Sequence, residues 1–317
     1  MKRQEFLKIL TGAAMAASPA RAQQSKMGTP ETVVYKTVPG CEIKLDVYPR
    51  GGNGHPALMF IHGGALMGGS RKQVGTPMLA ELARQGYVIV SIDYRLAPET
   101  KVPEIIEDLQ AAYQWMRGAG SIRFGIDAGR IAVAGASAGG YLTLMSGFCL
   151  EPRPRALVSY FGYGDIDGPW LAEPNEFYRK QGLLSKEEGW VGFGNGPVSE
   201  RSAEKHGQLY LYFRQQGIWP NEVSGHDPQR EAKWFDPYCP IRNVTKAYPP
   251  TLLIRGTADT DVPYAESQAM DARLKEAGVE HEFITVPGAG HGLVNAQPED
   301  RKRSTERAID WIQSHIK

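Results

Sequence analysis

Ser137 is the residue whose neighbours most directly indicate chemistry. It lies in Gly135-Ala136-Ser137-Ala138-Gly139, a G-x-S-x-G pattern that follows the apolar residues 131–134. The apolar run predicts a buried strand, and residues 138–148 predict the helix that follows it. At such a turn small neighbours leave the serine exposed, and the free N–H groups at the helix start face any anion formed beside it. The pattern predicts a nucleophilic serine; the alternative is a glycine-rich turn with an incidental serine.

A serine hydroxyl becomes a good nucleophile only when a base takes its proton and a carboxylate orients that base. His291 is the candidate base, because it lies in the glycine-rich segment 287–292 directly after the last predicted strand. Asp259 and Asp261 follow the penultimate predicted strand. Both are candidates for the acid. We predict that Asp259 binds the Nδ1–H group of His291, and that Asp261 caps or braces the following helix.

The segment His62-Gly63-Gly64-Ala65 follows an early apolar strand. It is similar to the H-G-G-G motif that supplies oxyanion-hole donors, with alanine in place of the third glycine. Alanine keeps its backbone N–H group, so the donor survives. We predict that Gly64, Ala65 and Ala138 donate to a tetrahedral oxyanion, which is what acyl transfer requires.

Together with the segment 93–99, these motifs resemble the α/β-hydrolase superfamily. More narrowly, they are similar to its hormone-sensitive-lipase-like and feruloyl/acetyl-esterase branches. The resemblance implies an eight-stranded, mainly parallel sheet and a serine-hydrolase mechanism that uses neither metal nor cofactor. It also implies that Ser137 is the nucleophile, Asp259 the acid and His291 the base. By the same resemblance the segment 93–98 braces the site.

The rest of the sequence predicts the elements that position these residues. A predicted antiparallel hairpin at 32–48 is followed by apolar strands that alternate with amphipathic helices. This alternation predicts an α/β-hydrolase fold, with a mostly parallel central sheet flanked by helices. Strands are predicted at 56–61, 87–93, 156–161, 250–255 and 280–286, and helices at 77–85, 102–116, 264–277 and 305–315.

The segment from about 162 to 248 interrupts this alternation and is rich in Gly, Pro, Trp and Tyr. We interpret it as a cap inserted over the sheet. Tyr163 and Trp170 are the predicted substrate-binding residues, because they directly follow a strand end and aromatic rings can stack on a sugar or an aromatic acyl group. The alternative is that these rings form the core of the cap.

Residues 1–22 combine a basic start, a short apolar segment and an A-x-A cleavage site, which predicts a signal peptide removed before Gln23. Residues 3–8 also resemble a twin-arginine motif, with Gln4 in place of the second arginine. We therefore expect residues 23–317 to form the hydrolase domain of a periplasmic or secreted bacterial protein. The alternative is an amphipathic first helix.

Composition narrows the range of partners. The net charge of +1 gives no reason to expect nucleic acid or an anionic membrane as a partner. No apolar run reaches the roughly 20 residues that span a bilayer. The odd number and wide spacing of the three cysteines argue against a disulfide scaffold or a metal site, and leave open one disulfide with one free thiol.

The sequence as a whole predicts an exported serine carboxylesterase that acts on short-chain or carbohydrate-linked esters, either acetyl or feruloyl, through an acyl-enzyme. Its expected partner is a small-molecule or polysaccharide-linked ester. Three alternatives remain open: a serine peptidase of the prolyl-oligopeptidase type, a lipase active at a lipid interface, and a non-catalytic binding protein on the same fold.

Overall fold

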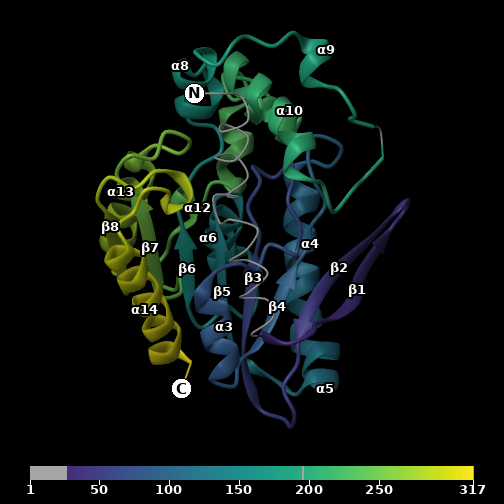
Figure 1. Cartoon of the computed structure of the whole chain (residues 1–317), viewed down its shortest axis with the longest axis vertical. Coiled ribbons are helices and arrows are strands. Elements are labelled where there is room, and N and C mark those ends of the chain that lie inside the picture. The colour runs from purple at the N-terminus through teal and green to yellow at the C-terminus, as the bar shows by residue number, and fades with distance from the viewer. Residues whose placement is uncertain (1–26, 195, 317) are drawn as a thin grey trace.

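One eight-stranded sheet forms the centre of the computed structural model (Figure 1), which describes residues 27–194 and 196–316. The predicted signal peptide, residues 1–22, lies outside the described residues. The strand order is β1-β2-β4-β3-β5-β6-β7-β8. The strands are β1 (Glu31–Val38), β2 (Cys41–Tyr48), β3 (His55–Ile61), β4 (Val88–Ile92), β5 (Ile126–Ala136), β6 (Leu157–Tyr160), β7 (Thr251–Gly256) and β8 (His281–Val286).

The sheet is mostly parallel, as the sequence predicts. The β1–β2 hairpin is antiparallel and joins the sheet through the antiparallel β2–β4 pair. All further neighbours, from β4 to β8, run parallel. The chain passes from β3 to β4 on one side and then back across β3 to β5. In sheets of this type ligands bind where the strand order changes direction, which here is at the carboxyl ends of β3 and β5.

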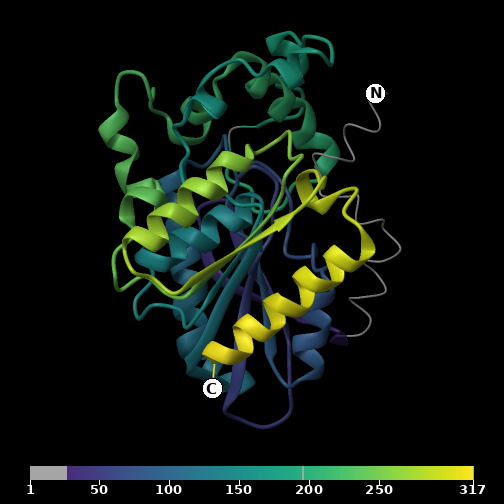
Figure 2. The ribbon, with the colours of Figure 1, turned by 90° about the vertical axis from the view of Figure 1, so that its left-hand side faces the viewer.

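Helices cover both faces of the sheet, which explains why its strands are apolar on both sides. Met59 and Ile61 of β3 belong to the core under one set of helices, whereas Leu58 and Phe60 belong to the core under the other. The yellow and yellow-green helices in Figure 2, α14 and α13, show the two layers on opposite sides of the sheet. The first layer contains α4 (Val102–Trp115), α6 (Ala138–Cys149) and α13 (Tyr264–Glu276), and the second contains α3 (Pro77–Arg84) and α14 (Pro298–His315).

The last helix differs from its prediction. The sequence predicts it at 305–315, but α14 begins at Pro298. Proline suits the first turn of a helix because its missing N–H group has no intrahelical partner there. The first turns of α14 are mostly charged and carry no apolar stripe, so periodicity alone could not reveal them.

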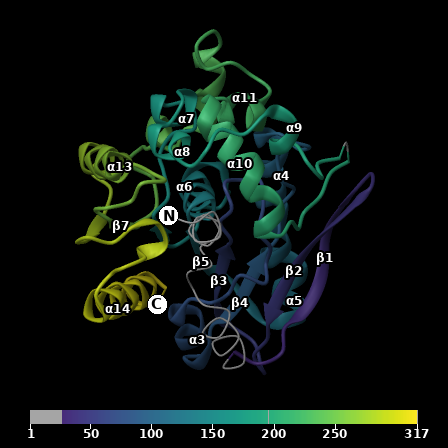
Figure 3. The same cartoon turned by 45° about the horizontal axis from the view of Figure 1, so that its top comes forward.

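The inserted segment forms helices of 4 to 14 residues that lie beyond the carboxyl ends of the parallel strands (Figures 1 and 3). Its side chains Leu209, Phe213 and Trp219 belong to the same hydrophobic cluster as Leu142 of α6. The cap therefore packs on the helices α4 and α6, which cover this face of the sheet. Its helices are α7 (Pro169–Ala172), α8 (Glu176–Arg179), α9 (Lys186–Gly189), α10 (Ala203–Gln216), α11 (Trp219–Ser224), η2 (Ala232–Tyr238) and α12 (Pro240–Asn243). Between α4 and β5 the chain forms η1 (Met116–Gly120) and α5 (Ser121–Phe124).

Helix α6 approaches the sheet so closely that Gly139 has no room for a side chain. A Cβ atom on Gly139 would lie 2.1 Å from the carbonyl oxygen of Ile61 and 2.6 Å from that of His62. Backbone atoms cannot give way as the end of a flexible side chain can. The glycine therefore fixes where α6 begins relative to β3.

We predict that Gly139→Ala lowers the free energy of unfolding by about 1–3 kcal/mol, because the added methyl group overpacks this contact. Denaturant unfolding measures the change. Gly118→Ala is the matched control: a Cβ atom there would have no atom within 4 Å, and alanine is the better helix former. An equal loss of unfolding free energy in both variants would contradict the explanation that α6 lies too close to β3 for a side chain at Gly139.

Candidate active site

Ser137 lies at the turn between β5 and α6 with φ 57° and ψ −120°. A positive φ is strained for a serine and persists only where the surroundings hold it. Two backbone hydrogen bonds do so: the Ser137 N–H donates to Tyr160 at 2.9 Å, and the Tyr141 N–H donates to Ser137 at 2.9 Å. The strained turn leaves Ser137 half-buried at the carboxyl edge of the sheet.

His291 lies between Ser137 and Asp259. It begins the short helix η3 (His291–Leu293) after β8 and is almost fully buried. Its Nδ1 atom lies 2.9 Å from Oδ2 of Asp259, and its Nε2 atom lies 2.9 Å from Oγ of Ser137. A carboxylate only accepts hydrogen bonds, so the proton belongs on Nδ1 and the lone pair of Nε2 faces the serine hydroxyl. The structure thus brings the predicted nucleophile, base and acid together.

Asp259 is held as an ionised carboxylate. Its Oδ1 atom accepts the backbone N–H groups of Asp261 at 2.9 Å and Val262 at 3.0 Å. Its Oδ2 atom also accepts from Nη1 of Arg255 at 3.0 Å. Burial alone would raise the pKa of Asp259, but His291, Arg255 and the backbone donors outweigh it and lower the pKa to about 2. No motif in the sequence predicts this role for Arg255, an arginine within an otherwise apolar strand.

Two opposed effects act on the imidazole. Burial lowers the pKa of His291, while the carboxylates of Asp259 and Asp261 raise it, and the net pKa lies above the usual histidine value. A base poised in this way is protonated in mildly acidic solution and becomes available as the pH rises.

The predicted oxyanion loop lies against the serine turn. A Cβ atom on Gly63 would lie 3.2 Å from Cβ of Ser137. Gly64 and Ala65 both have positive φ, of 117° and 55°. Neither N–H group has a hydrogen-bond acceptor among the described residues. Ala138 is the first residue of α6, where a backbone N–H group has no partner within the helix.

His62 and Tyr94 brace this loop. Their rings stack with centroids 4.4 Å apart, and the Tyr94 hydroxyl donates to the His62 carbonyl oxygen at 3.1 Å. Burial lowers the pKa of His62 to about 4, so its ring is neutral. The segment 93–98 therefore has the bracing role that the resemblance implies.

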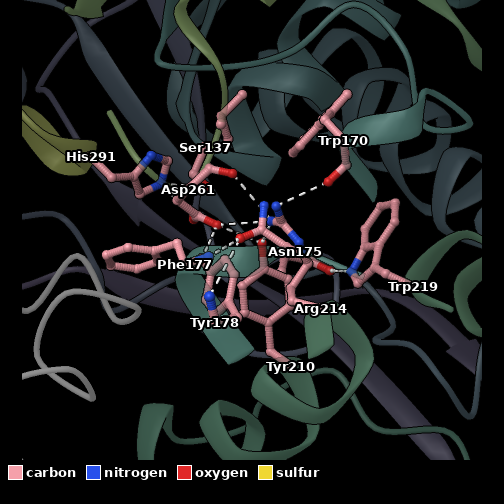
Figure 4. Close-up of polar contacts among 12 residues, drawn as sticks. Ser137, Trp170, Asn175, Phe177, Tyr178, Tyr210, Arg214, Trp219, Asp261 and His291 are labelled. Atoms are coloured by element: carbon pink, nitrogen blue, oxygen red, sulfur yellow. Dashed lines mark hydrogen bonds and ion pairs between the residues drawn. The ribbon is translucent and has the colours of Figure 1, made fainter. Parts of the chain in front are cut away.

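Asp261 does not brace α13, and that prediction is wrong. Helix α13 has no side-chain cap at its start. The Oδ1 atom of Asp261 instead accepts hydrogen bonds from the cap (Figure 4), and Oδ2 lies 3.4 Å from Nε2 of His291. The donors are the hydroxyl of Tyr178, the hydroxyl of Tyr210 at 2.7 Å and Nη1 of Arg214 at 3.0 Å. The sequence could not reveal this contact, because the donors lie on cap helices far from Asp261 in the chain.

The two predicted substrate-binding aromatics differ in their surroundings. Tyr163 is 3% exposed, because it stacks on Tyr141 at 5.1 Å and meets Trp170 and Trp219 edge-on. Its faces are covered, which favours the alternative that it is a core residue. Trp170 is half-buried and lies 5.2 Å from the guanidinium carbon of Arg214, which connects it to Asp261.

Within residues 27–194 and 196–316, no group of three or more His, Cys, Asp or Glu side chains could hold a metal ion. No helix in that part of the chain is long and apolar enough to cross a membrane. Cys41, Cys149 and Cys239 are free thiols.

Comparisons with known proteins fit this geometry. Residues 58–295 match a family model described as the α/β-hydrolase fold. Esterase LipC of Mycobacterium tuberculosis is 32% identical over 240 residues, which cover 75% of this chain and 53% of that protein. The non-reducing polyketide synthase Preu6 of Preussia isomera is 30% identical over 309 residues, which cover 86% of this chain and 14% of that protein. The chain thus spans about half of LipC and a much smaller share of Preu6.

Among solved structures, esterase 2 of the planctomycete Thermogutta terrifontis with bound propionate has a TM-score of 0.64 and 23% identity to this chain. The match covers 91% of this chain and 95% of that one. At this level of identity the likeness establishes the fold alone.

The electrostatics of His291 predict how labelling of Ser137 by a fluorophosphonate depends on pH. Labelling needs the neutral imidazole, so its rate should rise with pH and reach half its maximum above about pH 6.5, the ordinary histidine value. Asp261→Asn removes a negative charge that stabilises the imidazolium of His291. In this variant the pH at which labelling reaches half its maximum rate, the midpoint, should therefore be lower.

Glu276→Gln is the control, because that carboxylate is exposed on α13 and its loss should leave the midpoint unchanged. Identical midpoints in Asp261→Asn and the wild type would contradict the electrostatic role of Asp261.

Proposed function

This chain belongs to the α/β-hydrolase fold family, and we propose that it is a serine carboxylesterase. Ser137 is the nucleophile, His291 the general base and Asp259 the carboxylate that orients it. The observation that carries the proposal is the pair of 2.9 Å contacts that join His291 to Ser137 and to Asp259. The similarity to esterase LipC supports an ester rather than an amide as substrate.

The reaction follows from these contacts. His291 takes the proton of Ser137 while Oγ attacks the ester carbonyl carbon. The N–H groups of Gly64, Ala65 and Ala138 stabilise the oxyanion, each with an effect of about 10²–10³ in turnover. The ester C–O bond then breaks, and its electron pair stays on the leaving oxygen, which takes the proton from Nε2. Water attacks the acyl-enzyme by the same steps and releases the acid.

We propose short-chain or carbohydrate-linked esters, acetyl or feruloyl, as the substrates. The solved structure of Thermogutta terrifontis esterase 2 contains propionate, a short acyl group, and supports the short-chain choice. The half-buried ring of Trp170 lies against Arg214, which in turn binds Asp261. Such rings suit a sugar or a feruloyl group.

The proposal predicts hydrolysis of p-nitrophenyl acetate and butyrate and of methyl ferulate, with weaker hydrolysis of the octanoate. Ser137→Ala should lower kcat/KM by about 10⁴-fold or more, because it removes the hydroxyl that forms the acyl-enzyme. Ser314→Ala, at an exposed position on α14, is the matched control and should keep full activity.

Other outcomes would point to the alternatives. Cleavage of peptides without cleavage of esters would indicate a peptidase. A preference for the octanoate that grows at a lipid interface would indicate a lipase. If neither ester nor peptide is cleaved and fluorophosphonate fails to label Ser137, the protein is a binding protein and the proposal is wrong.

We further propose that residues 1–22 direct export to the periplasm or the medium and are removed before Gln23. Expression of the full chain in a bacterium should yield a mature protein whose first residue is Gln23, as N-terminal sequencing would report. Ala22→Leu should block cleavage because the A-x-A site needs small residues, whereas Gln24→Leu should not. An unprocessed wild-type chain that stays in the cytoplasm would contradict this proposal.

A further inference from the structure

The two carboxylate oxygens of Asp261 have different surroundings. Oδ1 is saturated by Tyr178, Tyr210 and Arg214. Oδ2 accepts no hydrogen bond from any residue that the structure describes. Nε2 of His291 lies 3.4 Å from Oδ2, and that nitrogen already bonds to Ser137. A carboxylate oxygen has lone pairs for two donors, so Oδ2 has unused accepting capacity at the catalytic centre.

The cap prevents this carboxylate from turning away. Arg214 is fully buried, and its ion pair with Asp261 spans 3.0 Å. Figure 4 shows Tyr178, Tyr210 and Arg214 converging on Asp261 from the cap side, opposite Ser137 and His291. The backbone N–H of Asp261 is also fixed, because it donates to Asp259. With Oδ1 and the backbone both held, Oδ2 stays directed at the imidazole.

Oδ2 lies on the side of His291 where the alcohol part of a bound ester leaves. In the proposed reaction Nε2 hands its proton to the leaving oxygen, which must therefore come within hydrogen-bond reach of Nε2. Oδ2 lies 3.4 Å from the same nitrogen. A polar group on the second carbon of the alcohol part, counted from the leaving oxygen, would thus lie beside Oδ2.

The charges around Asp261 determine which chemical group of a substrate Oδ2 can bind. An ionised carboxylate oxygen accepts and never donates, so its partner must carry an O–H or N–H group. Arg214 pairs with Oδ1, and when His291 holds the proton during the reaction, its cationic ring lies 3.4 Å from Oδ2 and repels a second cation. The site therefore favours a neutral hydroxyl over a cation, and it disfavours a group that offers only lone pairs.

We propose that Asp261 is a specificity-determining residue that selects esters of vicinal diols and polyols, by accepting a hydrogen bond from the hydroxyl next to the ester oxygen. This inference rests on the proposed esterase function. The hydroxyl keeps its own proton throughout. When the ester C–O bond breaks, the leaving oxygen takes the electron pair and the proton of Nε2, and Asp261 remains unchanged.

Three butyrate esters of similar size test the proposal: 2-hydroxyethyl, 2-methoxyethyl and propyl. The wild-type protein should hydrolyse the hydroxyethyl ester with a kcat/KM about tenfold or more above that of the methoxyethyl ester, because a hydrogen bond to a charged acceptor has an effect of this size. The propyl ester should lie between them. Each ratio is measured within one protein, so changes in the pKa of His291 or in the folded fraction cancel.

Asp261→Asn should bring the hydroxyethyl-to-methoxyethyl ratio close to one. The three donors to Oδ1 require the amide oxygen, which leaves the amide NH₂ group in the place of Oδ2, where it can donate to either ester. Tyr210→Phe is the matched variant: it removes one donor to Oδ1 and leaves Oδ2 in place, so the preference should remain.

Equal wild-type rates for all three esters, with hydrolysis that depends on Ser137, would overturn this inference and leave the esterase function intact. A preference for butyrylcholine over the hydroxyethyl ester would also overturn it, since it would assign Oδ2 to a cation. If none of the esters is hydrolysed and Ser137 is not labelled, the proposed function itself fails.

Discussion

The two hydrogen bonds of His291 are the interaction on which the rest of the site depends. A buried imidazole needs a partner at each nitrogen, and here the partners lie on opposite sides of the ring, with Asp259 at Nδ1 and Ser137 at Nε2. Because His291, Arg255 and backbone N–H groups together outweigh burial and lower the pKa of Asp259 to about 2, this carboxylate is always an acceptor. It fixes the proton on Nδ1 and leaves the Nε2 lone pair to the serine. A weaker acceptor in place of Asp259 would no longer hold the proton on Nδ1 of His291. The Nε2 lone pair would then not be available to take the proton of Ser137.

The sheet brings Ser137, Asp259 and His291 to one edge, where these hydrogen bonds can form. Ile61 of β3 pairs with Gly135 of β5, and Gly256 of β7 pairs with Val286 of β8. Neighbouring parallel strands therefore end level with one another, so the loops that follow them leave the sheet at one edge. The cap closes over this edge and reaches the same centre, since Tyr178, Tyr210 and Arg214 hold the carboxylate beside His291. The conformation of the cap and the electrostatics of the base are thus linked through one side chain, Asp261.

The sequence predicted the features that local patterns encode. The strand–turn–helix around Ser137, the sheet and its antiparallel hairpin, and the positions of Asp259 and His291 follow from short motifs at strand ends. The contacts of Asp261 escaped prediction because its donors lie on α8 and α10, far away in the chain. Arg255 escaped as well, since an arginine in a strand shows no partner until the strand is placed. Tyr163 looked like a pocket residue only because the rings that cover it come from other elements.

The most direct test of the account is the identity of the covalent intermediate. The protein is mixed with p-nitrophenyl acetate, quenched in acid within the burst phase, and digested for peptide mass spectrometry. The account predicts one added acetyl group on the peptide that carries Ser137, and none in the His291→Ala variant on the same time scale. Release of p-nitrophenol with the acetyl group on another residue, or with no acetylated peptide at any time, would contradict the role of Ser137 as the nucleophile.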